Sequence, residues 1–335
     1  MEVLIDASKL QLSDTPKLIS SQALSLLKDK KIKLSLDVYD SHINNRDISK
    51  PVLVCLHGNS MSKDLFLTEE VKKFTEIYRV IAIDLPGHGQ STHISSLDKL
   101  SQNEKELISS DFYNPCSMIA CLSQVLKKLQ LNNIHLLGWS LGGHMAYGIA
   151  TEIPEMIASI TTIASPPVFF PSSEGVRRGF NALFLEEIIP NWIANPQKLT
   201  LEWITKFSAP YSGYTEPEGK DKIFVAANLR SDPLMRKYLF LDMDKNISKA
   251  LDGEHFIKTS SLPLCLLKGG DDEFTGPDLY QNESTIFING GKFIHTASRV
   301  ITIPHAMHAP FRTHPEAFFK VLSQFITGLE PRQIK

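Results

Sequence analysis

The stretch His135–Ala146 reads HLLGWSLGGHMA and places three glycines within six residues. Glycine is costly inside regular structure and is usually kept where a turn needs positive φ or where two backbones touch. The apolar run Ile134–Leu137 before the glycines predicts a buried strand, and residues 141–150 after them predict a buried helix. A strand, a tight turn and a helix with Ser140 at the apex form the context of a nucleophile elbow. The alternative is a glycine-rich turn whose serine only caps the helix.

Short apolar runs recur along the chain and predict further strands. Residues 32–38 (IKLSLDV) alternate apolar and polar side chains, which is typical of a half-exposed strand. The other runs are continuous, as in strands covered on both faces, and comprise residues 52–56, 80–83, 160–164, 264–267 and 300–303. Helical patterns occur at 117–129 and 315–326. Alternating strands and helices predict an α/β fold with a mainly parallel central sheet flanked by helices.

The region 168–260 breaks this alternation. It is rich in prolines and aromatic residues and holds no convincing buried strand, so we expect a helical insertion over the sheet. The expected division is an N-terminal extension 1–30, a first core segment 31–167, a helical cap 168–260 and a second core segment 261–335. Residues 92–114 form a second, polar insertion.

The N-terminal extension contains one predicted helix, which starts near Pro16. The apolar residues of one face of that helix are Leu18, Ile19, Ala23, Leu26 and Leu27. Such a face either packs on the body of the protein, which we expect, or docks on a membrane or a partner.

Composition limits the class of protein. The chain of 335 residues is 42% apolar and 21% charged, as in globular proteins with a full core. A net charge of −2 without a dense basic cluster argues against a nucleic-acid partner. The N-terminus lacks the pattern of a signal peptide, no apolar run is long enough to span a bilayer, and four scattered cysteines do not make a disulfide framework. We therefore expect a cytoplasmic monomer or homodimer.

Polar, chemistry-bearing residues follow the ends of the predicted strands. A serine nucleophile needs a base, a group that orients the base and donors for an oxyanion, and in open α/β sheets such sites gather at the carboxyl ends of the strands. The segments after strand ends are HGNS at 57–60, DLPGHGQS at 84–91, the elbow at Ser140, KGGDDEF at 268–274 and PHAMHAPF at 304–311. Serine, acid and histidine therefore occur in that order along the chain.

These motifs resemble the α/β-hydrolase fold superfamily, in the branch with a helical cap inserted after the sixth strand. The resemblance covers residues 32–326 and includes the segment MHAPFRTHPEAF at 307–318, which resembles the family's histidine loop and final helix. It implies that Ser140 is the nucleophile, His308 its base and Asp272 the acid that orients the base. It also implies an oxyanion hole formed by the backbone N–H groups of Asn59 and Leu141.

The resemblance also guides the choice between neighbouring candidates. Asp272 is preferred to Asp271 because it stands three residues after Gly269, the usual position in this loop. His308 is preferred to His305 because it lies in the family's His-Ala-Pro context.

Other polar residues of these motifs have expected structural roles. We expect His57, His88 and Asp84 to stabilise their own loops by hydrogen bonds. The side chains of Asn59 and Ser60 either point into the pocket or stabilise the loop that carries them.

The pocket assignment from sequence is tentative and comprises Ser60, Trp139, Phe169 and Trp192. His305, His308 and His314 are close in sequence, but no carboxylate or cysteine pattern supports a metal site. We expect no metal and no cofactor. The segment 276–298 is longer than usual for the family and, with the 92–114 insertion, leaves the shape of the pocket open.

A serine at the elbow narrows the reaction. Dehalogenases and epoxide hydrolases of this fold use an aspartate nucleophile, so Ser140 argues against both. We expect a hydrolase that cleaves a carboxylester, thioester or lactone of a small to medium apolar substrate through an acyl-enzyme. The alternatives are a carbon–carbon bond hydrolase or an acyltransferase of the same fold, and a non-catalytic binding or receptor protein.

Overall fold

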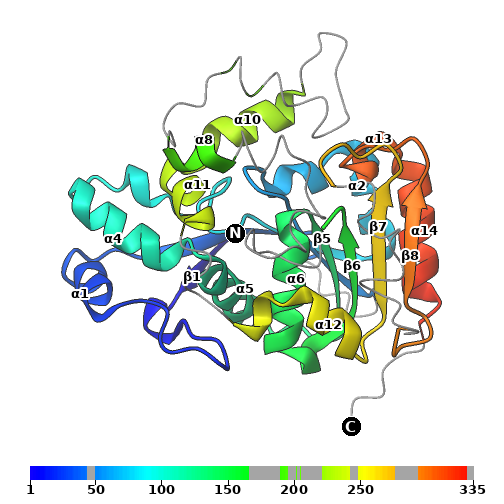
Figure 1. The fold of residues 1–335 in the computed structure, drawn as a ribbon, viewed down its shortest axis with the longest axis horizontal. Coiled ribbons are helices and arrows are strands. Elements are labelled where there is room, and N and C mark those ends of the chain that lie inside the picture. Colours follow the sequence, from blue (N-terminus) through cyan, green and yellow to red (C-terminus); the bar gives the residue numbers. More distant parts are fainter. Residues whose placement is uncertain are drawn as a thin grey trace.

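An eight-stranded sheet forms the centre of the computed structural model, which describes residues 1–43, 50–165, 189–194, 201, 204, 221–241, 248–275 and 293–329. The strand order is β1-β2-β4-β3-β5-β6-β7-β8 (Figure 1). The strands are β1 (Glu2–Ile5), β2 (Leu34–Asp40), β3 (Val52–Leu56), β4 (Arg79–Ile83), β5 (Ile134–Trp139), β6 (Ile157–Ile163), β7 (Leu264–Gly269) and β8 (Arg299–Ile303). All neighbouring pairs from β4 to β8 are parallel, and β2 pairs antiparallel with both β1 and β4. The predicted α/β-hydrolase sheet is confirmed.

Helices cover both faces of this sheet. The helices are α1 (Ser21–Asp29), α2 (Glu69–Lys72), α3 (Phe74–Ile77), α4 (Gln102–Phe112), α5 (Pro115–Lys128), α6 (Leu141–Glu152), α8 (Ile189–Ala194), α10 (Lys222–Arg230), α11 (Pro233–Phe240), α12 (Gly253–Thr259), α13 (Pro310–Thr313) and α14 (Pro315–Thr327). The predicted helices at 117–129 and 315–326 correspond to α5 and α14. Asn114 caps α5 by accepting from the N–H of Ser117 at 2.9 Å, and Pro115 fits the first helical turn.

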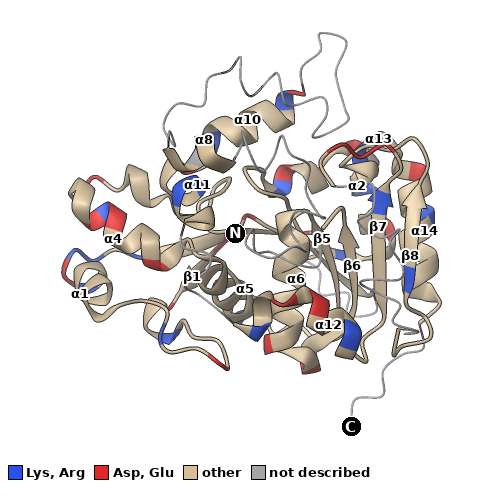
Figure 2. Cartoon of the chain, in the orientation of Figure 1, with Lys and Arg blue, Asp and Glu red and all other residues tan. Residues whose placement is uncertain are grey.

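The apolar strands β3 to β7 are continuous because side chains on both faces of each strand pack in a core. The predicted run 300–303 is different: it forms β8, the last strand of the sheet, where Val300 is 38% exposed, so this strand is not covered on both faces. In β3, Val54 and Leu56 join the core that includes residues of α5 and α6, whereas Leu53 and Cys55 join the core that includes residues of α3 and α14. Successive side chains of a strand point to opposite faces, so both sets must be apolar. Figure 2 shows the consequence: β5 and β6 carry no charged residue, and charged side chains lie on the outer helices and loops.

The N-terminal extension packs on the body of the protein, as expected. Its residues Ile19, Ala23 and Leu27 are buried in the main core. The predicted helix begins at Ser21 rather than near Pro16. The sequence analysis missed β1, which adds an antiparallel strand to the edge of the sheet next to β2.

The 92–114 insertion supplies α4, which links the extension to the cap. On one side, the hydroxyl of Ser20 donates to Asp111 at 2.6 Å. On the other side, Lys237 of α11 forms a 2.8 Å ion pair with Glu106. The insertion therefore joins two parts of the chain that are far apart in sequence.

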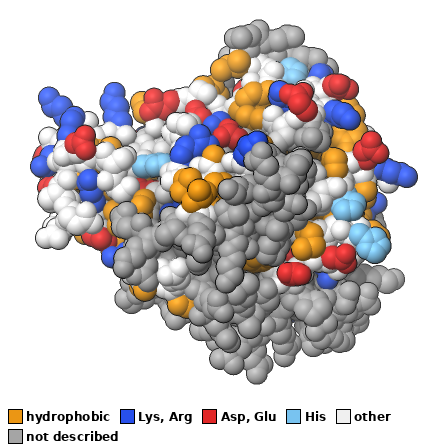
Figure 3. Space-filling model, turned by 90° about the horizontal axis from the view of Figure 1, so that it is seen from above, with side chains coloured by type: hydrophobic (Ala, Val, Ile, Leu, Met, Phe, Trp, Pro, Cys, Tyr) orange, Lys and Arg blue, Asp and Glu red, His pale blue; other side chains and the backbone are white. Residues whose placement is uncertain are grey.

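Between β6 and β7 the described residues form helices and no strand. The helices α8, α10 and α11 fit the predicted cap, whereas α12, which the prediction also placed in the cap, packs against α6 on the body of the protein, with the ring of Phe256 5.8 Å from that of Tyr147. In Figure 1, α8, α10 and α11 lie together above the sheet, with α11 next to α4. Seen from above in Figure 3, acidic and basic side chains are interspersed over the described part of this face. In the part of the chain that the structure describes, no helix is long and apolar enough to cross a membrane. All four cysteines are buried, and none of them forms a disulfide.

Candidate active site

Ser140 lies at the turn between β5 and α6, in a strained backbone conformation. Its φ of 52° and ψ of −117° fall in a region that residues with a side chain rarely adopt, at a cost of about 1–3 kcal/mol. Surrounding hydrogen bonds hold it there: its N–H donates to the carbonyl of Ile163 at 2.8 Å, and its carbonyl accepts from the N–H of Gly143 at 2.9 Å and from the hydroxyl of Ser165. The strand, turn and helix predicted around Ser140 are confirmed.

Two glycines make this turn sterically possible. A Cβ on Gly138 would lie 2.3 Å from the carbonyl oxygen of Gly142, so the strand touches the first turn of the helix. A Cβ on Gly142 would lie 2.1 Å from the carbonyl oxygen of Leu56, at the end of β3. Both distances are far below van der Waals contact. The glycines therefore allow α6 to start against the ends of β5 and β3, which fixes where Ser140 stands.

The structure pairs His308 with Asp272. The Nδ1 atom of His308 lies 2.9 Å from one carboxylate oxygen of Asp272 and 3.1 Å from the other. Burial would raise the pKa of Asp272, but the attraction of His308 and hydrogen bonds from His308, Thr275 and Phe274 outweigh it and hold this pKa below its usual value. Asp272 is therefore an anion that accepts the Nδ1 hydrogen, and Nε2 is the basic nitrogen of the ring.

The neighbouring candidates lie elsewhere. Asp271 and His305 are exposed, and they face each other at 3.5 Å rather than His308. The choice of Asp272 and His308 over these two residues therefore agrees with the geometry.

Trp139 connects the elbow to the histidine loop. Its indole Nε1 donates to the carbonyl of His308 at 2.8 Å, and its ring lies 5.4 Å from the ring of Phe311. Trp139 is fully buried. Predicted as a pocket residue, it lies under the histidine loop and supports that loop. The side chain of Trp192 and the whole of Phe169 lie outside the described residues.

The predicted oxyanion loop lies against the elbow. A Cβ on Gly58 would lie 3.3 Å from Cβ of Ser140, so this loop packs closely against Ser140. Asn59 is buried, and Ser60 has a left-handed backbone with φ of 57°. Leu141 is the first residue of α6, and a backbone N–H at the start of a helix lacks the acceptor one turn earlier that later residues have. These two backbone segments are suited to stabilise a negative charge beside Ser140.

Two buried histidines shape this loop, as expected. The N–H of Ser60 donates to Nε2 of His88 at 3.0 Å, and the N–H of Leu85 donates to Nε2 of His57 at 3.0 Å. Their Nδ1 atoms face the carbonyls of Pro86 and Gly58. Burial lowers the pKa of both rings, so both are neutral and one nitrogen of each accepts. They have the loop-stabilising role predicted for them.

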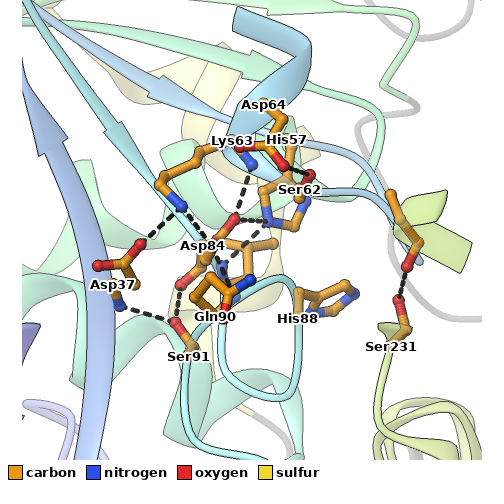
Figure 4. A network of polar contacts seen from close by, with 12 residues as sticks. Asp37, His57, Ser62, Lys63, Asp64, Asp84, His88, Gln90, Ser91 and Ser231 are labelled. Carbon is orange, nitrogen blue, oxygen red and sulfur yellow. Dashed lines mark hydrogen bonds and ion pairs between the residues drawn. The ribbon is translucent and has the colours of Figure 1, made fainter. Parts of the chain in front are cut away.

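A buried lysine that the sequence analysis missed ties the same region to β2. Figure 4 shows Lys63, which follows the oxyanion loop in the 3₁₀ helix η2 (Lys63–Phe66), extending between Asp37 and Asp84. Its Nζ lies 2.6 Å from Asp37 and 2.8 Å from Asp84. Asp84 also accepts from the N–H of Lys63 at 2.7 Å and from the N–H of Gln90 at 2.9 Å. Burial lowers the pKa of Lys63, but the bonds to the two carboxylates outweigh it and raise this pKa above its usual value.

Comparison with known proteins agrees with this geometry. The family described as alpha/beta hydrolase fold matches residues 51–315. The chain belongs to the α/β-hydrolase fold family. The matched region includes the elbow, the acid loop, the histidine loop and the oxyanion loop.

Curated relatives of this α/β-hydrolase are esterases. The chain is 27% identical over 274 residues to a pimeloyl-(acyl-carrier protein) methyl ester esterase of Aliivibrio fischeri (strain MJ11), covering 82% of this chain and 93% of the relative. It is 25% identical over 282 residues to the enzyme of the same name from Aeromonas hydrophila, covering 82% and 95%.

Solved structures share the fold. A variant of N-acyl homoserine lactonase AidH in complex with N-hexanoyl homoserine has a TM-score of 0.69 and 24% identity, covering 90% of this chain and 96% of that chain. The esterase RhEst1 from Rhodococcus sp. ECU1013 has a TM-score of 0.67 and 20% identity, covering 89% and 96%. At these identities the likeness describes the architecture of this α/β-hydrolase.

Proposed function

We propose that this α/β-hydrolase is a serine hydrolase that cleaves an ester-type bond through an acyl-enzyme. One observation carries the proposal: a serine on a strained strand-to-helix turn shares the carboxyl edge of the sheet with a buried Asp272–His308 pair. Trp139 and Gly58 connect the loops that carry these residues. A strained backbone at a serine persists only when the surrounding structure over-determines it, and this is typical of a functional residue.

The proposed reaction has two halves, and His308 acts first as base and then as acid in each half. Oγ of Ser140 attacks the carbonyl carbon while Nε2 of His308 takes its proton, and the N–H groups of Asn59 and Leu141 stabilise the oxyanion. His308 then gives the proton to the leaving alkoxide or thiolate, which leaves an acyl-enzyme. Water attacks the acyl carbon, again with His308 as base. Collapse of the second intermediate returns the proton to Ser140, and Asp272 orients the imidazole throughout.

The substrate class follows from the relatives and from the surroundings of the site. The curated relatives are named for hydrolysis of a methyl ester, and a structural neighbour for hydrolysis of an N-acyl homoserine lactone. The ring of Phe274 lies 5.5 Å from that of His308, so the imidazole has an apolar neighbour. We propose a carboxylester, thioester or lactone with a small to medium apolar acyl group. We also propose a cytoplasmic location, which fits four buried cysteines that form no disulfide.

A fluorophosphonate probe tests the proposal directly. The expected result is one adduct, which mass spectrometry places on the peptide that contains Ser140. Labelling should be absent in Ser140→Ala and strongly reduced in His308→Ala. Folded wild-type protein that takes up no label would overturn the proposal and favour a non-catalytic binding protein.

A substrate panel then separates the enzyme classes. It comprises p-nitrophenyl esters of increasing acyl length, an acyl thioester, an N-acyl homoserine lactone and a vinylogous diketone. We expect turnover of esters with short and medium acyl groups. Cleavage of the diketone alone would indicate a carbon–carbon bond hydrolase, and ester turnover that requires an added alcohol would indicate an acyltransferase.

A further inference from the structure

A buried arginine from the cap reaches the oxyanion loop. Arg236 lies on α11 and is only 3% exposed. Its Nε donates to the hydroxyl oxygen of Ser60 at 3.2 Å, and its Nη2 donates to the carbonyl oxygen of Asn228 in α10. One guanidinium therefore connects two cap helices to the residue that follows the proposed oxyanion donor Asn59.

No ion pair accounts for the burial of Arg236 among the described residues. Among the described residues, no carboxylate lies within 4 Å of its guanidinium. Asp232, one turn earlier on the chain, already accepts from the hydroxyl of Tyr113 at 2.6 Å, from the N–H of Ser95 at 3.0 Å and from the N–H of Leu234 at 2.9 Å. Burial lowers the pKa of Arg236 to about 10, and the attraction of Asp232 opposes this change. The side chain thus remains a cation at neutral pH, and burying a cation without a carboxylate in contact with it is costly.

Ser60, its acceptor, occupies an equally costly position. Its backbone is left-handed, with φ of 57°, where glycine or asparagine would be less strained. Its N–H is held from below by His88, and its hydroxyl is held from the cap by Arg236. Without the hydroxyl, the bond from Arg236 would have no acceptor here. A buried cation, Arg236, and a strained backbone, that of Ser60, are therefore joined by one hydrogen bond next to Asn59.

We propose that Arg236 is a positioning residue, which holds the oxyanion loop through Ser60 so that the N–H of Asn59 points at the reacting carbonyl. The inference rests on the proposed function, because it assigns a partner to the oxyanion hole of that reaction. It gives the cap a role in catalysis besides covering the site. A displaced N–H donor weakens stabilisation of the transition state more than it weakens substrate binding. Loss of the Arg236–Ser60 bond should therefore lower kcat.

The test measures the second-order rate of fluorophosphonate labelling together with kcat and KM for a p-nitrophenyl ester. The variants are Arg236→Met, Arg236→Lys, Ser60→Ala and the double variant Arg236→Met/Ser60→Ala. The matched control is Lys237→Met, which changes the next residue of α11, whose ion pair with Glu106 lies on the α4 side. Ser60→Ala removes one oxygen atom and carries the test if Arg236→Met does not give folded protein.

We expect Arg236→Met and Ser60→Ala each to lower the labelling rate and kcat by about 10-fold, less than the ~10²–10³-fold cost of losing an oxyanion donor. KM should stay the same, the double variant should be no slower than either single variant, and Arg236→Lys should restore part of the loss. Lys237→Met should label at the wild-type rate. Unchanged rates in both single variants, losses that multiply in the double variant, or a rise in KM alone would each overturn the inference while wild-type labelling leaves the proposed function intact. Absence of label on wild-type protein would overturn both.

Discussion

A Cβ atom on Gly142 would lie 2.1 Å from the carbonyl oxygen of Leu56 and 2.6 Å from its carbonyl carbon. Both neighbours belong to the backbone of β3, a central strand, so neither can move aside without disturbing the sheet. The helix that begins after Ser140 is therefore placed by contact between two backbones. Any side chain at this position pushes the elbow away from the oxyanion loop.

Gly142→Ala should consequently reduce activity by about 100-fold or more, because a displacement of about 1 Å in the site costs that much. It should also lower the free energy of unfolding by about 1–3 kcal/mol, as overpacking does. Ester turnover and urea denaturation measure the two effects. Gly328→Ala is the control: Gly328 ends α14 with ordinary helical dihedrals, and a Cβ there meets its nearest atom at 3.0 Å. Wild-type turnover by Gly142→Ala would contradict the elbow assignment.

Asp272→Asn should lower kcat by about 10⁴-fold, because an amide at this position disfavours the ring tautomer in which Nδ1 carries the hydrogen. Asp271→Asn is the matched control, since Asp271 is exposed and faces His305. We expect its kcat to equal that of wild type. A larger loss in Asp271→Asn than in Asp272→Asn, with both variants folded, would reverse the assignment.

Lys63→Met should destabilise the fold by about 3–5 kcal/mol, since it leaves the buried carboxylate of Asp84 without its cation. The midpoint of chemical denaturation measures this loss. Lys72→Met, which breaks the exposed ion pair with Glu69, should leave the midpoint unchanged. Equal midpoints for the two variants would mean that the Lys63 contacts in Figure 4 contribute nothing to the free energy of unfolding.

Arg312→Gln should loosen the cap at the histidine loop. Arg312 of α13 pairs with the fully buried Asp221, which also caps α10 by accepting from the N–H of Phe224 at 3.1 Å. We expect amide exchange in α10 to become about 100-fold faster, with α5 unchanged. Arg230→Gln at the other end of α10, whose pair with Asp64 is exposed, serves as the control and should have little effect. Unchanged exchange in Arg312→Gln would show that apolar packing alone holds α10.

Stability should fall as the pH drops below 6.5. Burial lowers the pKa of four histidines: His57, His88, His135 and His144. The lowered pKa is about 4 for His135 and about 3 for His144. Below pH 6.5 the unfolded chain binds protons that the folded protein does not, so each site favours unfolding until the pH reaches its folded pKa. His135 and His144 should each cost about 2 kcal/mol by pH 5, and His57 and His88 should act in the same direction.

His135→Gln isolates one of these contributions. The glutamine can still bond to Ser159, the 2.8 Å partner of the histidine. The difference in unfolding free energy between pH 7 and pH 5 should shrink in this variant by about 2 kcal/mol. His255→Gln, at an exposed position of α12, should leave that difference as in wild type. A wild-type pH dependence in His135→Gln would contradict the prediction.

The sequence by itself determined the elements and the order of the motifs. Strands buried on both faces must be apolar at every position, so β3, β5 and β7 are visible as continuous runs within one or two residues of their ends. The elbow is visible in the sequence for a similar reason, because close backbone contacts permit only glycine at positions 138 and 142, although the contact of Gly142 is with the distant strand β3. Residues that follow strand ends in a parallel sheet meet at one edge, which brought Ser140, Asp272 and His308 together in the prediction.

Only the tertiary structure decided which distant side chains support that edge. β1 has four residues and an exposed face, and its pairing with β2 is fixed by long-range register that no local pattern records. Lys63 with Asp37, Arg236 with Ser60, and Arg312 with Asp221 join residues between 26 and 176 positions apart. A charged residue read from sequence is usually an exposed surface residue. It is buried and links distant segments only where the folded chain supplies a hydrogen-bond acceptor or an opposite charge and excludes water.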